Sequence, residues 1–206
     1  FIPLLEQEGS IVALDYYVLE EVCRWLKKRM DEGQKPLCIS VNFSRKHLQE
    51  ENLVEHIVAV IDRYQIDHHY IEIELTESEE YQNFEMMTKL VGELKAKGIS
   101  TSMDDFGTGF SSLNMIKNVD LKVIKIDKSF IPLETEYPGK EKDLIMFRHI
   151  VSLVRELDKK TIAEGVETEK QLDYLKEVGC DIVQGYVFDR PLPQEQFEER
   201  LACGYE

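Results

Sequence analysis

The sequence predicts an α/β protein whose parallel strands form part of a TIM-like barrel, and two observations support this fold class. Short apolar, β-branched segments alternate with longer segments whose apolar residues recur at helical spacing. Alternation of this kind predicts a parallel sheet with right-handed crossovers. In addition, polar side chains stand at or just after the end of each apolar segment, and in an α/β barrel the carboxyl ends of the strands form the catalytic face.

The individual elements follow from these periodicities. Six strands are predicted, at residues 37–41, 71–75, 99–103, 123–126, 161–163 and 182–183. Four apolar stripes predict helices over 18–30, 87–94, 144–157 and 172–178, and a short helix is expected around Phe197. Thr168 and Gln171 have the spacing of a capping box before the fourth helix, and Gly179 suits the left-handed residue that ends it.

Composition limits the class of protein. The 206 residues are enough for one domain with a sizeable core. The net charge of −15 argues against binding to a nucleic-acid polymer, because phosphate chains would be repelled. There is no apolar run of the ~20 residues that a membrane span needs, and no signal peptide is visible, so no membrane contact is expected from this segment. Four widely spaced cysteines without metal spacing indicate free thiols in a reducing, cytoplasmic environment.

The residues that end the strands are the candidates for chemistry. In chain order they are Asn42, Glu74 with Glu77 three residues later, Asp104 and Asp105, Lys125 with Asp127, Glu164 with Glu167, and Gln184. Each side chain alone is weak evidence, because a lone Glu after a strand is usually a solvated loop residue or a helix cap. Six strands that all end in this way form a stronger pattern.

Two of these positions have competing interpretations. Asp104 and Asp105 repel each other unless a cation lies between them, or they belong to a solvated turn before the glycines that follow. Lys125 lies between Ile124 and Ile126 on a strand that should be buried, so its ammonium group needs a carboxylate partner. That partner could serve catalysis, or it could form a salt bridge that only stabilises the barrel interior.

Six motifs, in order, resemble those of the EAL-type cyclic di-GMP phosphodiesterases. The most specific is D-D-F-G-T-G-F-S-S-L at 104–113. The others are S-V-N-F-S at 40–44, E-L-T-E-S at 74–78, K-I-D at 125–127, A-E-G-V-E-T at 163–168, and Q-G-Y at 184–186 with P-L-P at 191–193. The opening F-I-P-L at 1–4 also resembles a stretch before the family's first long helix. The resemblance therefore extends over the whole chain and implies that residues 1–206 form one EAL domain.

The resemblance implies metal-dependent hydrolysis of cyclic di-GMP to linear pGpG. It implies that Asn42, Glu74 and Asp104 hold one metal ion, and that Asp104 and Asp105 bind a second. Such an oxygen-rich ligand set suits Mg²⁺ or Mn²⁺. Lys125 would orient or polarise the attacking water.

Further roles are implied for residues near the later strands. Glu164 is the candidate general base, or else a ligand of the second metal. Gln184 and Asp127 are expected to contact substrate, and Glu77 and Glu167 to support the loops around the site. In this family the loop after the paired aspartates links the active site to a dimer interface, so a homodimer is expected, together with sensory or GGDEF domains elsewhere in the full-length protein.

The chain departs from the family pattern at its beginning. The strand that carries the Glu-Ala-Leu motif, with its metal-binding Glu and a nearby substrate-binding Arg, precedes F-I-P-L in the family, and so does one further strand. We therefore expect six strands here with the N-terminal strands missing, since eight positions are needed to close the barrel. Three alternatives remain open: an inactive domain that senses cyclic di-GMP, a structural or dimerisation module, and a different metal-dependent barrel enzyme.

Overall fold

A computed structural model describes residues 1–76, 81–106, 116–131 and 139–203. The strands are β1 (Ile39–Phe43), β2 (Ile71–Thr76), β3 (Ser100–Phe106), β4 (Val123–Ile126), β5 (Lys160–Ala163) and β6 (Ile182–Val183). The α-helices are α1 (Ile2–Glu8), α2 (Ile11–Asp31), α3 (Leu53–Arg63), α4 (Tyr81–Ala96), α6 (Lys140–Glu156), α7 (Glu169–Val178) and α8 (Gln194–Cys203). Short 3₁₀ helices lie at η1 (Arg45–Gln49), η2 (His68–Tyr70) and η3 (Lys128–Phe130).

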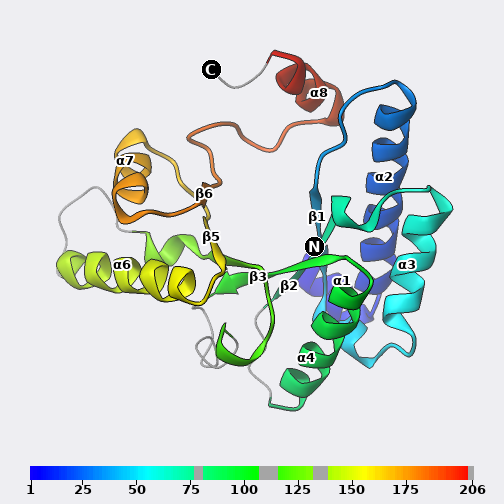
Figure 1. The fold of residues 1–206 in the computed structure, drawn as a ribbon, viewed down its shortest axis with the longest axis horizontal. Coiled ribbons are helices and arrows are strands. Elements are labelled where there is room, and N and C mark those ends of the chain that lie inside the picture. Colours follow the sequence, from blue (N-terminus) through cyan, green and yellow to red (C-terminus); the bar gives the residue numbers. More distant parts are fainter. Residues whose placement is uncertain (77–80, 107–115, 132–138, 204–206) are drawn as a thin grey trace.

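The strands form one parallel sheet in the order β1-β2-β3-β4-β5-β6, which is also their order in the sequence. Each strand pairs with its neighbour in the chain, and the connections after β1, β2, β4 and β5 contain the helices α3, α4, α6 and α7, as in the wall of a (β/α) barrel. In Figure 1, α2, α3 and α4 lie on one flank of the sheet, and α6 and α7 lie on the other. The predicted α/β architecture and the six predicted strands are confirmed.

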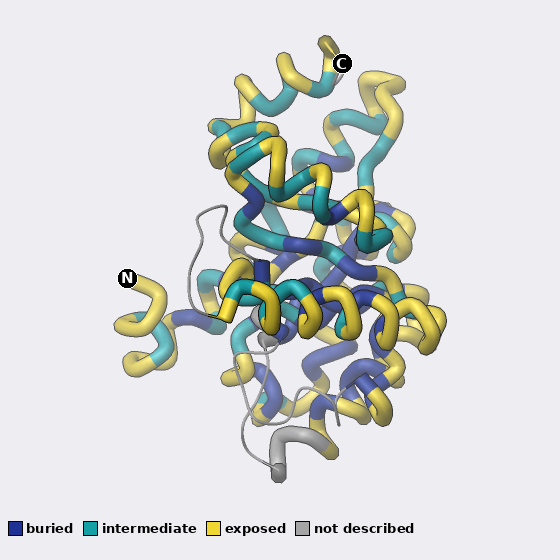
Figure 2. The backbone as a smooth tube through the Cα atoms, turned by 90° about the vertical axis from the view of Figure 1, so that its left-hand side faces the viewer, coloured by how far each residue is buried: buried dark blue, intermediate teal, exposed yellow. Residues whose placement is uncertain are grey.

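The apolar core lies between the sheet and its outer helices. The larger cluster joins α2, α3 and α4 to the first four strands, and a smaller one joins α6 and α7 to the end of β4 and to β5. Figure 2 shows the buried backbone concentrated in the middle of the molecule, with exposed turns outside it. Helix α3 was missed by the sequence analysis, although Leu53, Ile57 and Ile61 recur at helical spacing and are buried.

Local capping agrees with the sequence-based expectations. The Thr168 hydroxyl accepts a hydrogen bond from the Gln171 backbone amide, and the Thr168 backbone amide donates one to the Gln171 side-chain oxygen, which completes the capping box of α7. Gly179 ends the same helix in the left-handed conformation, with φ of 77°. No helix in the described part of the chain is long and apolar enough to cross a membrane.

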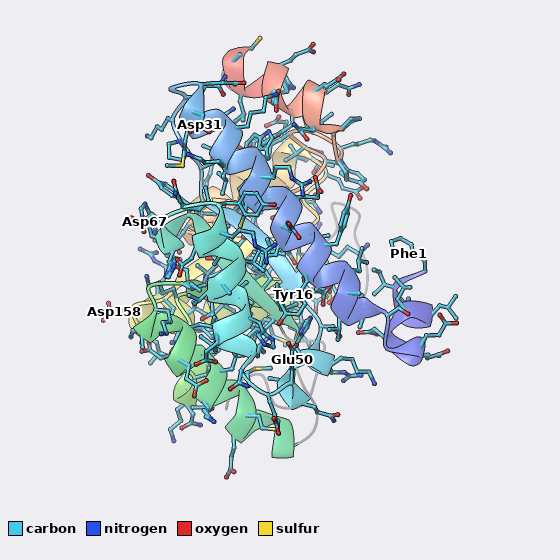
Figure 3. The ribbon with its side chains drawn as sticks, turned by 90° about the vertical axis from the view of Figure 1, so that its right-hand side faces the viewer. Phe1, Tyr16, Asp31, Glu50, Asp67 and Asp158 are labelled. Atoms are coloured by element: carbon cyan, nitrogen blue, oxygen red, sulfur yellow. The ribbon has the colours of Figure 1, made fainter. Side chains whose placement is uncertain are left out.

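A buried polar cluster fixes the carboxyl end of β1 against α2. The ring nitrogens of His47 lie 3.1 Å from Asp15 Oδ2 and 2.9 Å from Glu50 Oε2, and this imidazole is almost fully buried. The Ser44 amide donates to Asp15 Oδ2 at 2.9 Å, and the Tyr16 hydroxyl donates to Glu50 Oε1 at 2.8 Å. Figure 3 shows Tyr16 and Glu50 beside each other. These contacts hold the backbone that leaves β1 just after the predicted site residue of this strand.

Helix α8 packs against α2, the first long helix. The Trp25 indole of α2 donates to Glu198 Oε1 at 2.6 Å, and its ring lies 5.9 Å from that of Phe197. In Figure 1, α8 lies near the upper end of α2, on the side of the molecule between β1 and β6. Within the described residues β1 pairs only with β2 and β6 only with β5, so this helix bridges the two flanks of an open sheet.

Candidate active site at the carboxyl ends of the strands

The register of the sheet brings the predicted residues to one edge. Asn42 of β1 pairs with Glu74 of β2, and Asp104 of β3 pairs with Thr76, two residues beyond Glu74. Because the strands are parallel, these residues all lie toward their carboxyl ends. Lys125 lies one residue before the end of β4. The sheet thus collects side chains that are up to 122 positions apart in the chain, from Asn42 to Glu164 directly after β5.

The pairing of β3 with β4 is irregular at the two adjacent aspartates. Met103 pairs with Ile124 and Phe106 pairs with Ile126, so β3 has one more residue than β4 over this interval. The extra residue falls at Asp104 and Asp105, opposite Lys125. Bulges of this kind redirect side chains and are common beside active sites.

Lys125 is the centre of the site. Its Nζ atom lies 2.8 Å from Glu74 Oε2, 3.1 Å from Asp104 Oδ1 and 2.7 Å from Glu164 Oε1. The lysine side chain is 5% exposed, and the exposed fractions of the three carboxylates are 8%, 17% and 18%. The sequence predicts one carboxylate partner for this lysine, and the structure supplies three, from β2, β3 and the end of β5.

Burial and charge act in opposite directions on the ionisable groups. Burial raises the pKa of Glu164, the neighbouring Lys125 ammonium lowers it, and the charge of Asp104 raises it, which together give a pKa of about 7. For Lys125, burial alone would lower the pKa, but the hydrogen bonds to Glu164 and Glu74 outweigh this effect and raise it. The site therefore contains a firmly protonated lysine beside a carboxyl group that titrates near neutral pH.

The donor atoms fit a hard divalent cation. Asn42, Glu74, Asp104 and Glu164 offer only oxygen atoms of the kind that Mg²⁺ and Mn²⁺ prefer. Asp104 Oδ1 is buried and lies near Lys125 Nζ, but it forms no hydrogen bond with the residues that the structure describes. An oxygen of this kind can accept a metal ion. Among the described side chains, no three Asp, Glu, His or Cys residues form a ready-made metal cage, since the carboxylates surround the ammonium group instead.

Comparison with known proteins places this arrangement in a family. The EAL domain family matches residues 1–191. The chain belongs to the EAL domain family. It is 36% identical over 201 residues to the cyclic di-GMP phosphodiesterase NbdA of Pseudomonas aeruginosa, covering 98% of this chain and 25% of the relative. It is 34% identical over 196 residues to the oxygen sensor protein DosP of Escherichia coli, covering 95% and 24%. The EAL chain thus spans about a quarter of the length of these relatives.

Solved EAL structures have the same fold. A structure described as the PaMucR phosphodiesterase in complex with c-di-GMP superposes with a TM-score of 0.85 at 35% identity, covering 96% of this chain and 78% of that one. The EAL domain of DcpA from Mycobacterium smegmatis gives a TM-score of 0.84 at 28% identity, covering 93% and 85%. Phosphodiesterases of the EAL family are metal-dependent, which agrees with the oxygen-rich site described above.

The remaining predicted residues of the EAL site are less enclosed. Asn42 and Gln184 are exposed at the carboxyl ends of β1 and β6. Asp127 follows β4 and accepts a hydrogen bond from the Ser129 amide at 2.9 Å, which caps η3. Glu167 is exposed, and its backbone amide donates to the Gln171 side chain. A substrate or support role for these residues stays a prediction.

Two predicted residues cannot be placed in the same detail. Glu77 lies outside the described residues. Asp105 belongs to β3, but its side chain lies outside the described part of the chain. Ser102 was not among the predicted site residues; it pairs with Glu74 across the sheet, is fully buried, and its hydroxyl makes no hydrogen bond to any described residue. Its signal was that positions 100, 102 and 104, which share one face of the strand, are all polar.

Proposed function

We propose that this EAL domain hydrolyses one phosphodiester bond of cyclic di-GMP and releases linear pGpG. The observation that carries the proposal is the buried Lys125 ammonium group with carboxylates from three other strand ends around it. Such a site combines a fixed positive charge with a proton acceptor at the catalytic edge of a barrel. The relatives named as cyclic di-GMP phosphodiesterases, and the c-di-GMP complex of a similar structure, support the choice of substrate.

Glu164 and Lys125 act on the attacking water in this proposal. Glu164 accepts a proton from the water as its oxygen bonds to phosphorus, and a general base works best when its pKa is near the working pH, as it is here. Lys125 holds the water and the base in place through its short contact with Glu164. The bond from phosphorus to the ribose oxygen then breaks, and that oxygen takes up a proton.

Asn42, Glu74, Asp104 and Asp105 would hold two divalent metal ions, and Mg²⁺ or Mn²⁺ fits their oxygen atoms. When bound, the metal ions neutralise phosphate charge and lower the pKa of a coordinated water. The protein is strongly acidic overall, with a net charge of −15, so this neutralisation matters for accepting an anionic substrate.

Outer residues complete the proposed site. Gln184 and Asp127 flank Glu164 at the ends of β6 and β4 and would contact the substrate. Glu77 and Glu167 would support the loops after β2 and β5. We also propose that residues 1–206 belong to one EAL domain, that it forms a homodimer, and that sensory or GGDEF domains accompany it. Its four free cysteines favour a cytoplasmic location.

The test is a direct assay of the product. The purified protein is incubated with cyclic di-GMP and Mg²⁺ or Mn²⁺, and pGpG is followed by chromatography. We expect metal-dependent product, a loss of at least about 100-fold in kcat for Glu164→Gln, and little change for the exposed Glu93→Gln. Cyclic di-GMP binding measured by calorimetry without any pGpG would identify a sensor instead. Turnover by Glu164→Gln at the wild-type rate would refute the role of this base.

A further inference from the structure

Backbone hydrogen bonds between β4, β5 and β6 continue one residue past the carboxyl ends of these strands. Ile126, Ala163 and Val183 form one row of the sheet. The Glu164 amide donates to the Ile126 carbonyl at 3.1 Å, and the Gln184 amide donates to the Ala163 carbonyl at 2.8 Å. The next row therefore consists of the three polar residues at these strand ends, with Glu164 in the middle, and the amides of Glu164 and Gln184 bond to the row before it.

One residue further, the loop after β5 packs directly against the loop after β4. Gly165 has φ of +66°, a left-handed conformation that disfavours other residues. A β-carbon added at Gly165 would lie 2.7 Å from Cβ of Lys128, at the start of η3, and 3.2 Å from its Cδ. The Lys128 Cβ atom is bonded to the backbone and cannot swing away, so only glycine permits this approach.

The loop after β6 packs on the other side even more closely. A β-carbon at Gly185 would overlap with the amide nitrogen and the carbonyl oxygen of Val166, and would lie 2.8 Å from its carbonyl carbon. The same peptide is held by hydrogen bonds, since the Val166 amide donates to the Gln184 carbonyl at 3.2 Å and the Val187 amide donates to the Val166 carbonyl at 2.9 Å. The Val166 side chain is fully buried. Gly185 thus lies against backbone that is fixed by hydrogen bonds and by a buried side chain.

We propose that Gly185 is a positioning residue for Glu164, and that the loops after β4, β5 and β6 form one interlocked unit through Lys128, Gly165 and Gly185. Gly185 touches neither substrate nor metal in this proposal. It acts through Val166, two residues after Glu164, and so determines where the Glu164 carboxylate lies relative to Lys125 Nζ. The inference rests on the proposed function, because it assigns a role in the reaction that Glu164 performs.

A positioning role predicts a specific kinetic change. Displacement of a reacting group by about 1 Å can reduce turnover by about 100-fold while the rest of the site still binds substrate. A merely structural role predicts instead that activity falls only in proportion to the folded fraction of protein, and that it recovers at lower temperature. The separation of kcat from KM therefore distinguishes the two explanations.

The experiment compares Gly185→Ala with Gly92→Ala. Gly92 is exposed in α4, has no positive φ, and a β-carbon there would meet no atom within 4 Å, so this variant is a matched control. For Gly185→Ala we expect kcat to fall about 10- to 100-fold, with KM and the calorimetric Kd for cyclic di-GMP changed less than about 3-fold. Hydrogen exchange at the Val166 amide should become faster. Gly92→Ala should match the wild type in all four measurements.

A second pair of variants decides the question if Gly185→Ala does not fold. Gly165→Ala creates a clash with the Cβ atom of Lys128, and the added substitution Lys128→Gly removes that atom. We expect the double variant to regain at least about 3-fold in kcat over Gly165→Ala, since the contact and not general stability limits turnover. If the double variant regains no kcat over Gly165→Ala, the proposal of an interlocked unit is wrong.

The outcomes separate the two proposals. If the wild type turns over cyclic di-GMP and folded Gly185→Ala has the wild-type kcat, the positioning role is wrong and the proposed function stands. A fall in kcat that is matched by an equal rise in the Kd for cyclic di-GMP also contradicts positioning. If the wild type binds cyclic di-GMP without producing pGpG, the proposed function fails, and the positioning role fails with it.

Discussion

Replacing Lys125 by methionine keeps the volume of the side chain but removes the positive charge from among three carboxylates. The ammonium group lies 2.7–3.1 Å from Glu164, Glu74 and Asp104 and is 5% exposed, so water cannot replace it without opening the site. Removing one partner of a buried ion pair costs ~3–5 kcal/mol, because an uncompensated charge stays behind. We expect Lys125→Met to lower the free energy of unfolding of the metal-free protein by about 4 kcal/mol at neutral pH.

The assay is urea denaturation followed by circular dichroism in the presence of EDTA. With a denaturant slope of about 2 kcal/mol/M, the midpoint should shift by about 2 M. Acidification should reduce the difference from wild type, because protonation of the carboxylates removes their mutual repulsion. Mg²⁺ or Mn²⁺ should also stabilise the variant, since a bound cation restores positive charge.

The matched control is Lys89→Met, on a side chain that is 77% exposed and only loosely paired with Glu93. This change should alter the free energy of unfolding by less than about 0.5 kcal/mol. If Lys125→Met is as stable as the control and insensitive to pH, the three carboxylates are not held by this lysine, and the electrostatic account of the site is wrong.

Three further variants test other parts of the structure. Burial raises the pKa of Glu164 from 4.5 to about 7. In metal-free protein the stability that this group contributes is therefore complete below about pH 4.5 and is lost as the pH rises through 7. Glu164→Gln should remove this pH dependence of the free energy of unfolding in denaturation curves. His47→Ala should lower the free energy of unfolding by about 3 kcal/mol, because it leaves Asp15 and Glu50 without their buried partner. Thr168→Ala should lower it by about 1 kcal/mol through loss of the capping box.

Each of these predictions can fail clearly. An unchanged pH dependence in Glu164→Gln would mean that this carboxyl group titrates alike in the folded and unfolded states. A loss below about 1 kcal/mol in His47→Ala, similar to that of the exposed His69→Ala, would show that the buried cluster contributes little. A Thr168→Ala protein as stable as the wild type would mean that solvent satisfies the first turn of α7 equally well.

Much of this architecture was predictable because the responsible interactions are local. The bounds of β4 and β6 agree with the runs at 123–126 and 182–183, since short segments rich in β-branched residues are typical of strands. The capping box at Thr168 and the left-handed Gly179 follow from backbone preferences within one helical turn. The missed helix α3 had a clear apolar period, so its omission was an error of interpretation rather than a lack of signal.

The site was predicted as a set of residue types, and its geometry was not. A lysine between two isoleucines needs a carboxylate, but sequence spacing does not say that Glu74, Asp104 and Glu164 all reach the same Nζ atom. The extra residue in β3 also became visible only through its pairing with β4. Both features depend on register between strands, which is set by side-chain packing over the whole sheet.

The sequence by itself therefore determined the alternation of strands and helices, the polar residues at the strand ends, and the membership of the EAL family that its ordered motifs indicate. Only the tertiary structure decided that a buried lysine contacts three carboxylates, and that Gly185 lies against the Val166 peptide. The physical reason is distance along the chain. Periodicity and capping act within a few residues, whereas burial, charge pairing and backbone contact arise between segments that meet only when the sheet has formed.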